Sequence, residues 1–336
     1  MAIRCFAAKS KKEALVPYEY EPQPLGPWDI EVKITHCGIC HSDISLIDNE
    51  WGISRYPLVP GHEIVGTVVS LGSNVQELKV GQRVGIGWQR SSCMHCEWCI
   101  QGEENLCLLQ EATCVGHQGG FAESIRADSR FAFAIPDELD SAHVAPLFCG
   151  GATVYSPLVH HGITPMSRIG IIGVGGLGHL ALQFAKGFGC EITAFSSSRE
   201  KEEESKQLGA HHFISSVDKD SLQKAANSFD FLLCTVPTPL NWEEYLNCLR
   251  PKGTLCFVGA QTKPIEVPFF SIINGRKQVC ASNIASRPDM NTLLRFAVLH
   301  GVQAQVELFP MREVNQAIEK VRSGAIRYRA VLYNES

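Results

Sequence analysis

The sequence lacks the features that would suit it to a membrane or to a nucleic acid. Its longest uncharged stretches, 144–159 and 169–185, fall short of about 18 continuous apolar residues and are interrupted by Gly or Pro, so we predict no membrane span. Basic residues are not in excess, because the net charge is −5, and this argues against nucleic acid as a partner. Repeats and low-complexity tracts are also missing, and we expect an ordered chain.

What is present is typical of a globular protein with two domains. The chain has 336 residues, of which 45% are apolar and 19% charged. It opens without a charged-then-apolar signal segment, so its fourteen cysteines suit a reducing cytoplasm, with thiols binding metals, better than disulfides. Eight of these thiols show no ligand spacing, and we predict that they are buried apolar residues: Cys5, Cys37, Cys114, Cys190, Cys234, Cys248, Cys256 and Cys280.

Four other cysteines lie close together in the pattern Cys93-x2-Cys96-x2-Cys99-x7-Cys107. Four thiolates at such gaps can close a tetrahedral cage around one Zn²⁺ and leave no position for chemistry. An iron–sulfur cluster is the alternative, but the ferredoxin pattern has a third gap of x3 and ends in Cys-Pro. Here the gap is x7 and Leu108 follows, which favours a structural zinc site.

A second set of candidate ligands is dispersed along the chain. Cys40, His62 and Cys149 could hold one metal ion and leave a vacancy for substrate, as catalytic zinc sites do. We expect Asp43 to orient the imidazole of His62, and Glu63 to tune the charge of the metal or to exchange as a ligand. Because Cys149 lies where the β-rich region ends, we expect the metal in a cleft between two domains.

The pattern of the chain changes at Cys149. Before it, Pro and Gly separate short alternating segments, and we predict strands at 30–34 and 64–69 and a turn at 81–85 that leads into a third. After it, strands predicted at 168–172, 191–196, 229–235 and 254–258 alternate with helices at 179–188, 200–208 and 242–249. This alternation predicts a parallel sheet covered on both faces. Beyond about 286 we expect helices at 290–300 and 314–323 and a strand at 328–332, which return to the first domain.

The first predicted βα turn carries a dinucleotide-binding pattern. Gly173, Gly175 and Gly178, with Gly176 and Leu177 between them, permit a tight turn and a close approach of pyrophosphate to a helix N-terminus. The next strand ends in the segment 196–201, Ser-Ser-Ser-Arg-Glu-Lys, where an NAD site normally has an acid. Hydroxyls and cations suit a 2′-phosphate, so the segment favours NADP(H), although Ser198 is also a good N-cap for the helix that follows.

Taken in order, these motifs resemble the zinc-dependent medium-chain alcohol dehydrogenases, specifically the cinnamyl-alcohol-dehydrogenase-like branch. The resemblance covers essentially the whole chain and includes the segments 38–43, 57–63, 87–93 and 149–157 and the glycine turn with its serine successor. It implies an α/β fold with a GroES-like β-rich catalytic domain (1–149 and 286–336) and a Rossmann domain with a doubly wound parallel sheet (150–285). It also implies a homodimer with two zinc ions per chain, which exchanges hydride between NADP(H) and an alcohol–aldehyde pair.

The resemblance further implies roles for individual residues. Zinc held by Cys40, His62 and Cys149 would polarise the substrate oxygen, and Ser42 would bond that oxygen and pass its proton to the nicotinamide ribose. The remaining cofactor contacts would come from His41 at the pyrophosphate, Thr153 at the nicotinamide, and Ser197, Ser198, Lys201 and Arg199 at the 2′-phosphate.

Two positions depart from the family pattern. Many relatives end the proton relay in a histidine where this chain has Ser45, so the relay here would end in water or in another group such as His41. Specialists for aromatic alcohols tend to carry a tryptophan near Ala112, and a smaller residue weakens strict specificity for cinnamyl substrates. An apolar pocket for aromatic or medium aliphatic aldehydes could still be lined by Trp51, Ile53, Trp88, Phe270 and Ile284, each equally plausible as core.

Two alternatives remain. An NAD-dependent polyol or formaldehyde-type zinc dehydrogenase would want an acid after the second Rossmann strand. A non-catalytic, metal-stapled binding protein would need an incomplete set of catalytic ligands, whereas Cys40, His62 and Cys149 are all present.

Overall fold

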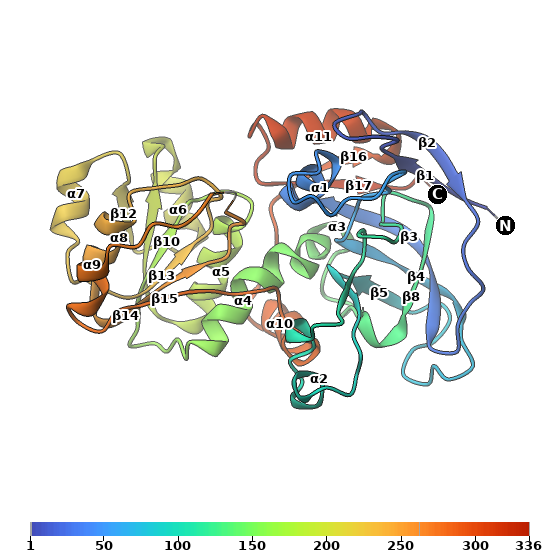
Figure 1. Ribbon diagram of the computed structural model, residues 1–336, viewed down its shortest axis with the longest axis horizontal. Coiled ribbons are helices and arrows are strands. Elements are labelled where there is room, and N and C mark those ends of the chain that lie inside the picture. Colours follow the sequence, from blue (N-terminus) through green and yellow to red (C-terminus); the bar gives the residue numbers. More distant parts are fainter. Residues whose placement is uncertain (1, 262, 336) are drawn as a thin grey trace. The chain divides into compact units, whose positions relative to one another are not determined.

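The computed structural model describes residues 2–261 and 263–335 and divides into two compact units. The first comprises Met1–Ala152 and Ala285–Ser336, and the second comprises Thr153–Ile284 (Figure 1). The sequence analysis placed these boundaries at 149/150 and 285/286. In the structure the first boundary falls inside helix α4 (Gly150–His160) rather than before it.

The first unit is rich in strands. Its strands are β1 (Ile3–Ala7), β2 (Val16–Tyr20), β3 (Asp29–Ile39), β4 (Ile64–Leu71), β5 (Arg83–Ile86), β6 (Gln89–Ser91), β7 (Glu111–Ala112), β8 (Ser124–Asp128), β9 (Ala132–Ala134), β16 (Val306–Pro310) and β17 (Arg329–Tyr333). Its helices are α1 (His41–Ile47), α2 (Glu97–Gln101), α3 (Ser141–Val144), α10 (Arg287–His300) and α11 (Val314–Arg322), with 3-10 turns η1 (Glu104–Leu106), η2 (Ser129–Phe131), η3 (Ala145–Phe148) and η5 (Met311–Glu313).

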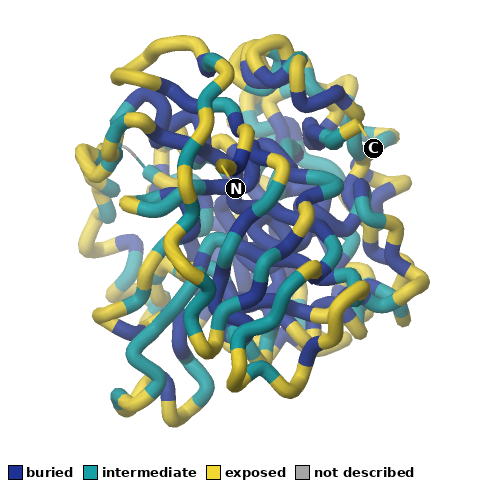
Figure 2. The backbone as a smooth tube through the Cα atoms, turned by 90° about the vertical axis from the view of Figure 1, so that its right-hand side faces the viewer, coloured by how far each residue is buried: buried dark blue, intermediate teal, exposed yellow. Residues whose placement is uncertain are grey.

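The main sheet of this unit pairs a C-terminal strand with strands from the first third of the chain. Its strand order is β16-β17-β3-β4-β5-β9, and β8 also pairs with β3. Strand β17 lies antiparallel to β3, with Ala330 opposite Ile39, and parallel to β16. Val32 and Ile34 on β3 are buried with Val68 on β4, as expected for strands with one face toward a core. Figure 2 shows the backbone coloured by burial, with exposed segments in yellow on the outer loops. The C-terminal strand therefore belongs to the β-rich unit, close to the N-terminal metal-ligand candidates.

The second unit is a doubly wound parallel sheet. Its strands are β10 (Arg168–Ile172), β11 (Glu191–Ser196), β12 (His212–Ser215), β13 (Phe229–Cys234), β14 (Leu249–Phe257) and β15 (Gln278–Ala281). Its helices are α5 (Gly178–Phe188), α6 (Glu202–Leu208), α7 (Lys219–Lys224), α8 (Trp242–Cys248) and α9 (Phe269–Ile273), with the 3-10 turn η4 (Arg199–Lys201). The spatial order β12-β11-β10-β13-β14-β15 has its switch point between β10 and β13, which is the Rossmann arrangement and confirms the predicted fold class.

Some elements of this unit were not predicted. The predicted strands at 168–172 and 191–196 match β10 and β11, and the helix predicted at 200–208 begins as the turn η4. Strands β12 and β15 and helices α7 and α9 were missed, because each has only four to six residues and the strands contain exposed positions. Among the described residues, the structure has no helix that combines the length and the apolar character needed to cross a membrane.

Candidate functional site

Cys40, His62 and Cys149 lie close together inside the first unit. Cys40 is the N-cap of α1, His62 precedes β4, and Cys149 follows η3. The Cys149 thiol is 3.9 Å from that of Cys40 and 3.2 Å from Nε2 of His62, and all three side chains are buried. Tetrahedral zinc with ordinary bond lengths separates such donor atoms by about 3.5–3.8 Å. The three donors therefore fit one zinc ion, and three ligands leave a fourth position for another group.

Asp43 connects the segment of Cys40 with the segment of His62. One carboxylate oxygen accepts the backbone N–H of Cys40 at 2.9 Å, and the other lies 2.9 Å from both the Gly61 nitrogen and Nδ1 of His62. The carboxylate accepts the proton of Nδ1, which turns Nε2 toward Cys149. Burial opposes the charging of His62, but Asp43 and Cys149 raise its pKa well above the ordinary value. The neighbouring anions thus favour positive charge at this position, and a zinc ion would replace the proton on Nε2 while Asp43 keeps the one on Nδ1.

Glu63, next to His62 in sequence, points toward the same donors. One of its oxygens pairs with the guanidinium of Arg329 on β17, and the other, Oε2, is buried with no described hydrogen-bond partner. Burial raises the pKa of Glu63 to about 7, although Arg329 lowers it. A Glu63 oxygen and the donors of Cys40, His62 and Cys149 all lie within 4.8 Å of one another, so Glu63 is a fourth candidate ligand.

The sequence analysis did not name Arg329. A weak signal was present, because Arg329 is a charged residue in a segment otherwise predicted as an apolar strand. Its side chain is almost fully buried, and the adjacent Glu63 raises its pKa although burial lowers it. Arg329 therefore supplies a permanent positive charge next to Glu63, at a site that also contains the thiols of Cys40 and Cys149.

The two thiols of this site differ in acidity. Hydrogen bonding from Cys149 and from His62 lowers the pKa of Cys40 well below its ordinary value, although burial raises it. The pKa of Cys149 is raised, first by its bond to Cys40 and then by burial. A divalent cation would relieve the repulsion between two thiolates, since thiolate is the ligand form of cysteine.

The second predicted metal site lies in the loop around α2. The sulfurs of Cys93, Cys96, Cys99 and Cys107 all lie within 4.8 Å of one another, and those of Cys93 and Cys99 are 3.9 Å apart. The backbone N–H of Cys96 donates to the Cys93 sulfur at 3.3 Å, and that of Leu109 donates to the Cys107 sulfur at 3.4 Å. Such bonds stabilise thiolates, so the loop is suited to a closed Zn²⁺ site.

Other predicted site residues lie along α1. Ser42 is half-buried in its first turn and His41 is exposed. Ser45 is buried, and its hydroxyl donates to Oε2 of Glu50 at 2.6 Å, a partner that the sequence analysis did not name. Near His62, the ring of Trp88 makes an edge contact at 5.0 Å between centroids, and Trp51 contacts Trp88 at 6.1 Å. The structure thus brings two of the five pocket candidates close to the metal ligands.

In the second unit, the glycine turn has the shape that a pyrophosphate requires. Gly173 has a φ of +92°, which disfavours other residues, and a Cβ on Gly178 would lie 1.9 Å from the Gly173 carbonyl oxygen. A Cβ on Gly175, by contrast, would meet no described atom within 4 Å. The turn therefore packs tightly against the helix while its middle leaves room for a ligand, as expected at the N-terminus of α5.

The serine segment lies beside this turn. The Lys201 ammonium donates to the carbonyl oxygen of Val174 at 2.6 Å, which joins the end of β11 to the glycine turn. Ser197 is exposed and Ser198 half-exposed, and the Ser198 hydroxyl makes no capping bond to any described backbone N–H of η4. Arg199 is exposed and lies 3.7 Å from Asp218. The hydroxyls are thus placed to meet a ligand, whereas Thr153 lies elsewhere, buried in α4.

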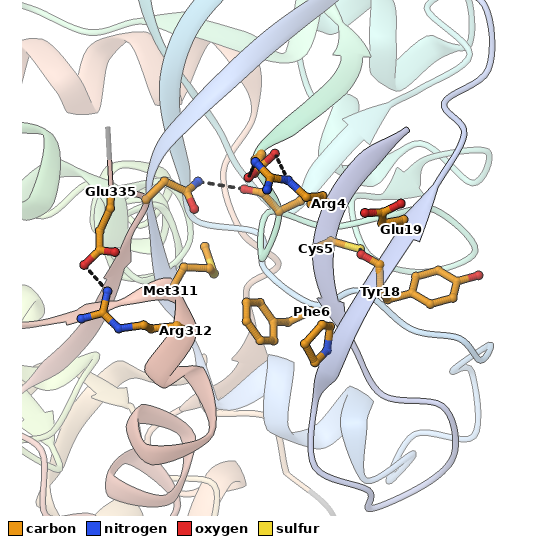
Figure 3. Close-up of a pocket in the computed structure, with 12 residues that line it drawn as sticks. Arg4, Cys5, Phe6, Tyr18, Glu19, Met311, Arg312 and Glu335 are labelled. Carbon is orange, nitrogen blue, oxygen red and sulfur yellow. Dashed lines mark hydrogen bonds and ion pairs between the residues drawn. The ribbon is translucent and has the colours of Figure 1, made fainter. Parts of the chain in front are cut away.

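A separate cavity of about 710 Å³ opens in the first unit, between the β1–β2 hairpin and the C-terminal segment (Figure 3). Its two arginines are already paired, Arg4 with Glu123 and Arg312 with Glu335. Among the described residues, its lining includes none of the predicted site residues. The cavity therefore has volume but lacks convergent ligands. We place the candidate catalytic site at Cys40, His62 and Cys149 instead.

Comparison with known proteins bears on both units. Residues 26–137 match the alcohol dehydrogenase GroES-like domain, and residues 176–298 match the zinc-binding dehydrogenase family. The chain is 44% identical over 330 residues to an aldehyde reductase of Synechocystis sp., with 98% of each chain covered.

Two solved structures have the same fold. A cinnamyl alcohol dehydrogenase of Sorghum bicolor superposes with a TM-score of 0.96 at 37% identity, covering 99% of this chain and 98% of the other. A protein of the same name from Helicobacter pylori, complexed with NADP(H), superposes with a TM-score of 0.92 at 29% identity and 99% coverage of both chains.

Proposed function

The chain belongs to the zinc-binding, GroES-like alcohol dehydrogenase family, and we propose that it works mainly as an NADPH-dependent aldehyde reductase. It is a zinc-dependent oxidoreductase that transfers hydride between NADP(H) and a primary alcohol–aldehyde pair. The observation that carries the proposal is the buried set of Cys40, His62 and Cys149, whose separations fit one zinc ion with a position left for substrate.

The residues around this set determine how the metal would be held. Cys40, His62 and Cys149 hold the zinc, Asp43 fixes the tautomer of His62, and Glu63 approaches as a carboxylate that can exchange as a ligand. When bound, zinc acts as a Lewis acid that polarises the aldehyde oxygen for hydride attack. Cys93, Cys96, Cys99 and Cys107 hold a second zinc ion, which stabilises their loop without taking part in chemistry.

The residue that transfers the proton lies in the first turn of α1. Ser42 lies two positions beyond the ligand Cys40, and its hydroxyl donates a proton to the oxygen that becomes the alcohol. Further along the helix, Ser45 donates to Glu50. Many relatives have a histidine at the position of Ser45, which ends their proton relay. In this chain Ser45 is bonded to a carboxylate instead, which supports a proton relay that ends at a different group.

The cofactor is held by the second unit. Gly173, Gly175, Gly176, Leu177 and Gly178 bind the pyrophosphate through the N-terminus of α5. His41 contributes to the pyrophosphate and Thr153 to the nicotinamide. The 2′-phosphate is recognised by Ser197, Ser198, Arg199 and Lys201, because the strand end carries hydroxyls and cations and the segment 196–199 contains no carboxylate. NADPH, when bound, supplies the hydride.

The substrate class follows from the apolar side chains near the ligands. Trp88 packs against His62 and Trp51 against Trp88, which suits aromatic or medium aliphatic aldehydes. Ala112, on the short strand β7, adds no bulk, so the chain should accept more than cinnamyl substrates. A panel of aliphatic and aromatic aldehydes with NADPH, followed at the nicotinamide absorbance, tests this. Turnover of polyols with NAD, and none of aldehydes with NADPH, would contradict the proposal.

We also place the protein in the cytoplasm as a homodimer. All fourteen cysteines are unpaired in the described structure, as a reducing compartment would keep them. Strand β15 is the last strand of the parallel sheet, with Val279 exposed on it and Phe269, Phe270 and Ile273 exposed on the neighbouring α9. Pairing of two β15 edges would cover this apolar surface. Light scattering that gives the mass of a monomer would contradict it.

A further inference from the structure

A third cluster of metal-ligating side chains lies in the second unit, next to the β15 edge that we assign to the dimer contact and away from the residues proposed to bind zinc and NADP(H). Cys256 on β14 and Cys280 on β15 are cross-strand partners in the parallel sheet. His161 follows the end of α4, and its backbone N–H donates to the Pro157 carbonyl oxygen at 3.0 Å, which holds it in the last turn of that helix. The sequence analysis treated both thiols as buried apolar residues, but Cys280 is partly exposed.

The three side chains converge on one point. The ligand atoms of His161, Cys256 and Cys280 all lie within 4.8 Å of one another, and the Cys280 sulfur is 3.5 Å from Nε2 of His161. This sulfur–nitrogen separation is about what tetrahedral zinc imposes on two of its ligands. The imidazole also packs against the ring of Phe231 at 5.0 Å between centroids, which restricts its orientation. The cluster thus meets the same geometric test as the two sites described above.

The local charges suit a divalent cation. Two thiolates and one neutral imidazole would balance the charge of one Zn²⁺, so the site could remain half-buried without a net charge. The carbonyl end of α4 adds partial negative charge beside His161. In the single chain His161 is exposed and Cys280 is partly exposed, so water can supply the fourth ligand there.

We propose that His161, Cys256 and Cys280 form a third metal site, which takes a thiophilic divalent cation such as Zn²⁺. It has three protein ligands, of which one is exposed and one partly exposed, so it should bind more weakly and exchange faster than the two sites of the first unit. Nothing in this proposal depends on hydride transfer, because the site is built only from residues of β14, β15 and the end of α4.

Equilibrium dialysis of the full-length protein against Zn²⁺, with a phosphine reductant to keep the thiols reduced, tests the proposal. Wild-type protein should hold two tightly bound zinc ions and take up one further equivalent as free Zn²⁺ rises. Cys280→Ser and Cys256→Ser should each lose this equivalent and keep the other two. His161→Gln should weaken it, whereas His160→Gln, a change at the adjacent exposed histidine, should not. Cys190→Ser controls for removal of a buried thiol elsewhere in the same unit.

A second measurement does not depend on any variant. Zn²⁺ should protect Cys280 of the wild-type protein from alkylation by iodoacetamide, as read by peptide mass spectrometry. Uptake of only two equivalents, or an alkylation rate of Cys280 that Zn²⁺ leaves unchanged, would overturn the proposal. If the two tight zinc ions were missing and the exchangeable one present, the failure would lie with the proposed function, and the third site would stand.

Discussion

The Asp43 carboxylate lies 2.9 Å from Nδ1 of His62, and both side chains are fully buried. The same carboxylate accepts the backbone N–H groups of Cys40 and Gly61. A single acid thereby sets the direction of the imidazole and joins the two segments that carry the first two metal ligands. Its effect on the metal is indirect, which makes it a positioning residue.

Asp43→Asn should weaken the metal site without removing a ligand. The amide keeps an acceptor for one backbone N–H but cannot hold the proton on Nδ1 as a carboxylate does. We expect about a 10–100-fold loss in affinity for the catalytic zinc, the usual range for such partners, with a parallel loss of turnover. Chelator competition followed by metal analysis measures it. The zinc held by Cys93–Cys107 serves as the internal control, and equal loss of both ions would point to unfolding instead.

Removing one ligand from each proposed zinc site should have different consequences. Cys149→Ser should reduce the zinc content from two to one per chain and abolish turnover while the fold is retained, because the ligand sits in an open catalytic site. Cys107→Ser should also remove one zinc, but chiefly lower the melting temperature, because the closed site stabilises its loop and takes no part in chemistry. Metal analysis and thermal unfolding separate the two. Retained activity in Cys149→Ser would exclude it as a ligand.

Cofactor preference should depend on the end of β11. NADPH is expected to bind far more tightly than NADH to the wild-type protein. Ser197→Asp should reverse this, since a carboxylate repels a 2′-phosphate and accepts a ribose hydroxyl; we expect about a 10–100-fold loss in NADPH affinity, the energy of about one charge-assisted hydrogen bond. Fluorescence titration with both cofactors measures the ratio of their dissociation constants. Ser323→Asp, at an exposed serine of the first unit, is the control. Equal affinities of the wild type would refute the phosphate site.

The buried pair of Glu63 and Arg329 should contribute strongly to stability. Arg329→Met leaves the Glu63 carboxylate buried without its cation, which typically costs about 3–5 kcal/mol. Urea unfolding of the zinc-loaded protein measures the change in free energy. Arg312→Met breaks the exposed pair with Glu335 and should change stability by less than about 1 kcal/mol. Similar losses in both variants would show that the Glu63 pair gains nothing from burial.

Cys280 should react with thiol reagents over an unusual pH range. Because its pKa is lowered to about 5, the thiolate is already present at neutral pH, and its alkylation rate should stay nearly constant between about pH 7 and 9. An ordinary thiol would show a rising rate over that range. In metal-free protein, His161→Gln should lower the rate at neutral pH by raising the pKa. Cys190, whose pKa burial raises to about 11, should remain unreactive throughout.

Much of the fold could be predicted from the chain because its signals are local. The thiol spacing between Cys93 and Cys107 restricts those sulfurs to one loop, and a glycine turn between a strand and a helix has few other uses. The alternation after Cys149 indicated the parallel sheet, although the short strands β12 and β15 carried too few apolar residues to be recognised.

The remaining relationships were decided by tertiary packing. Arg329 reaches Glu63 only because β17 returns to pair with β3, and no local pattern specifies which acid a C-terminal arginine will meet. Cys256 and Cys280 become partners through the register of two parallel strands, and His161 joins them from the end of a helix. The sequence by itself thus determined the family, the chemistry of the ligands and the closed thiol loop. Only the folded chain decided which distant charges and thiols meet, because such contacts depend on strand pairing and not on spacing along the chain.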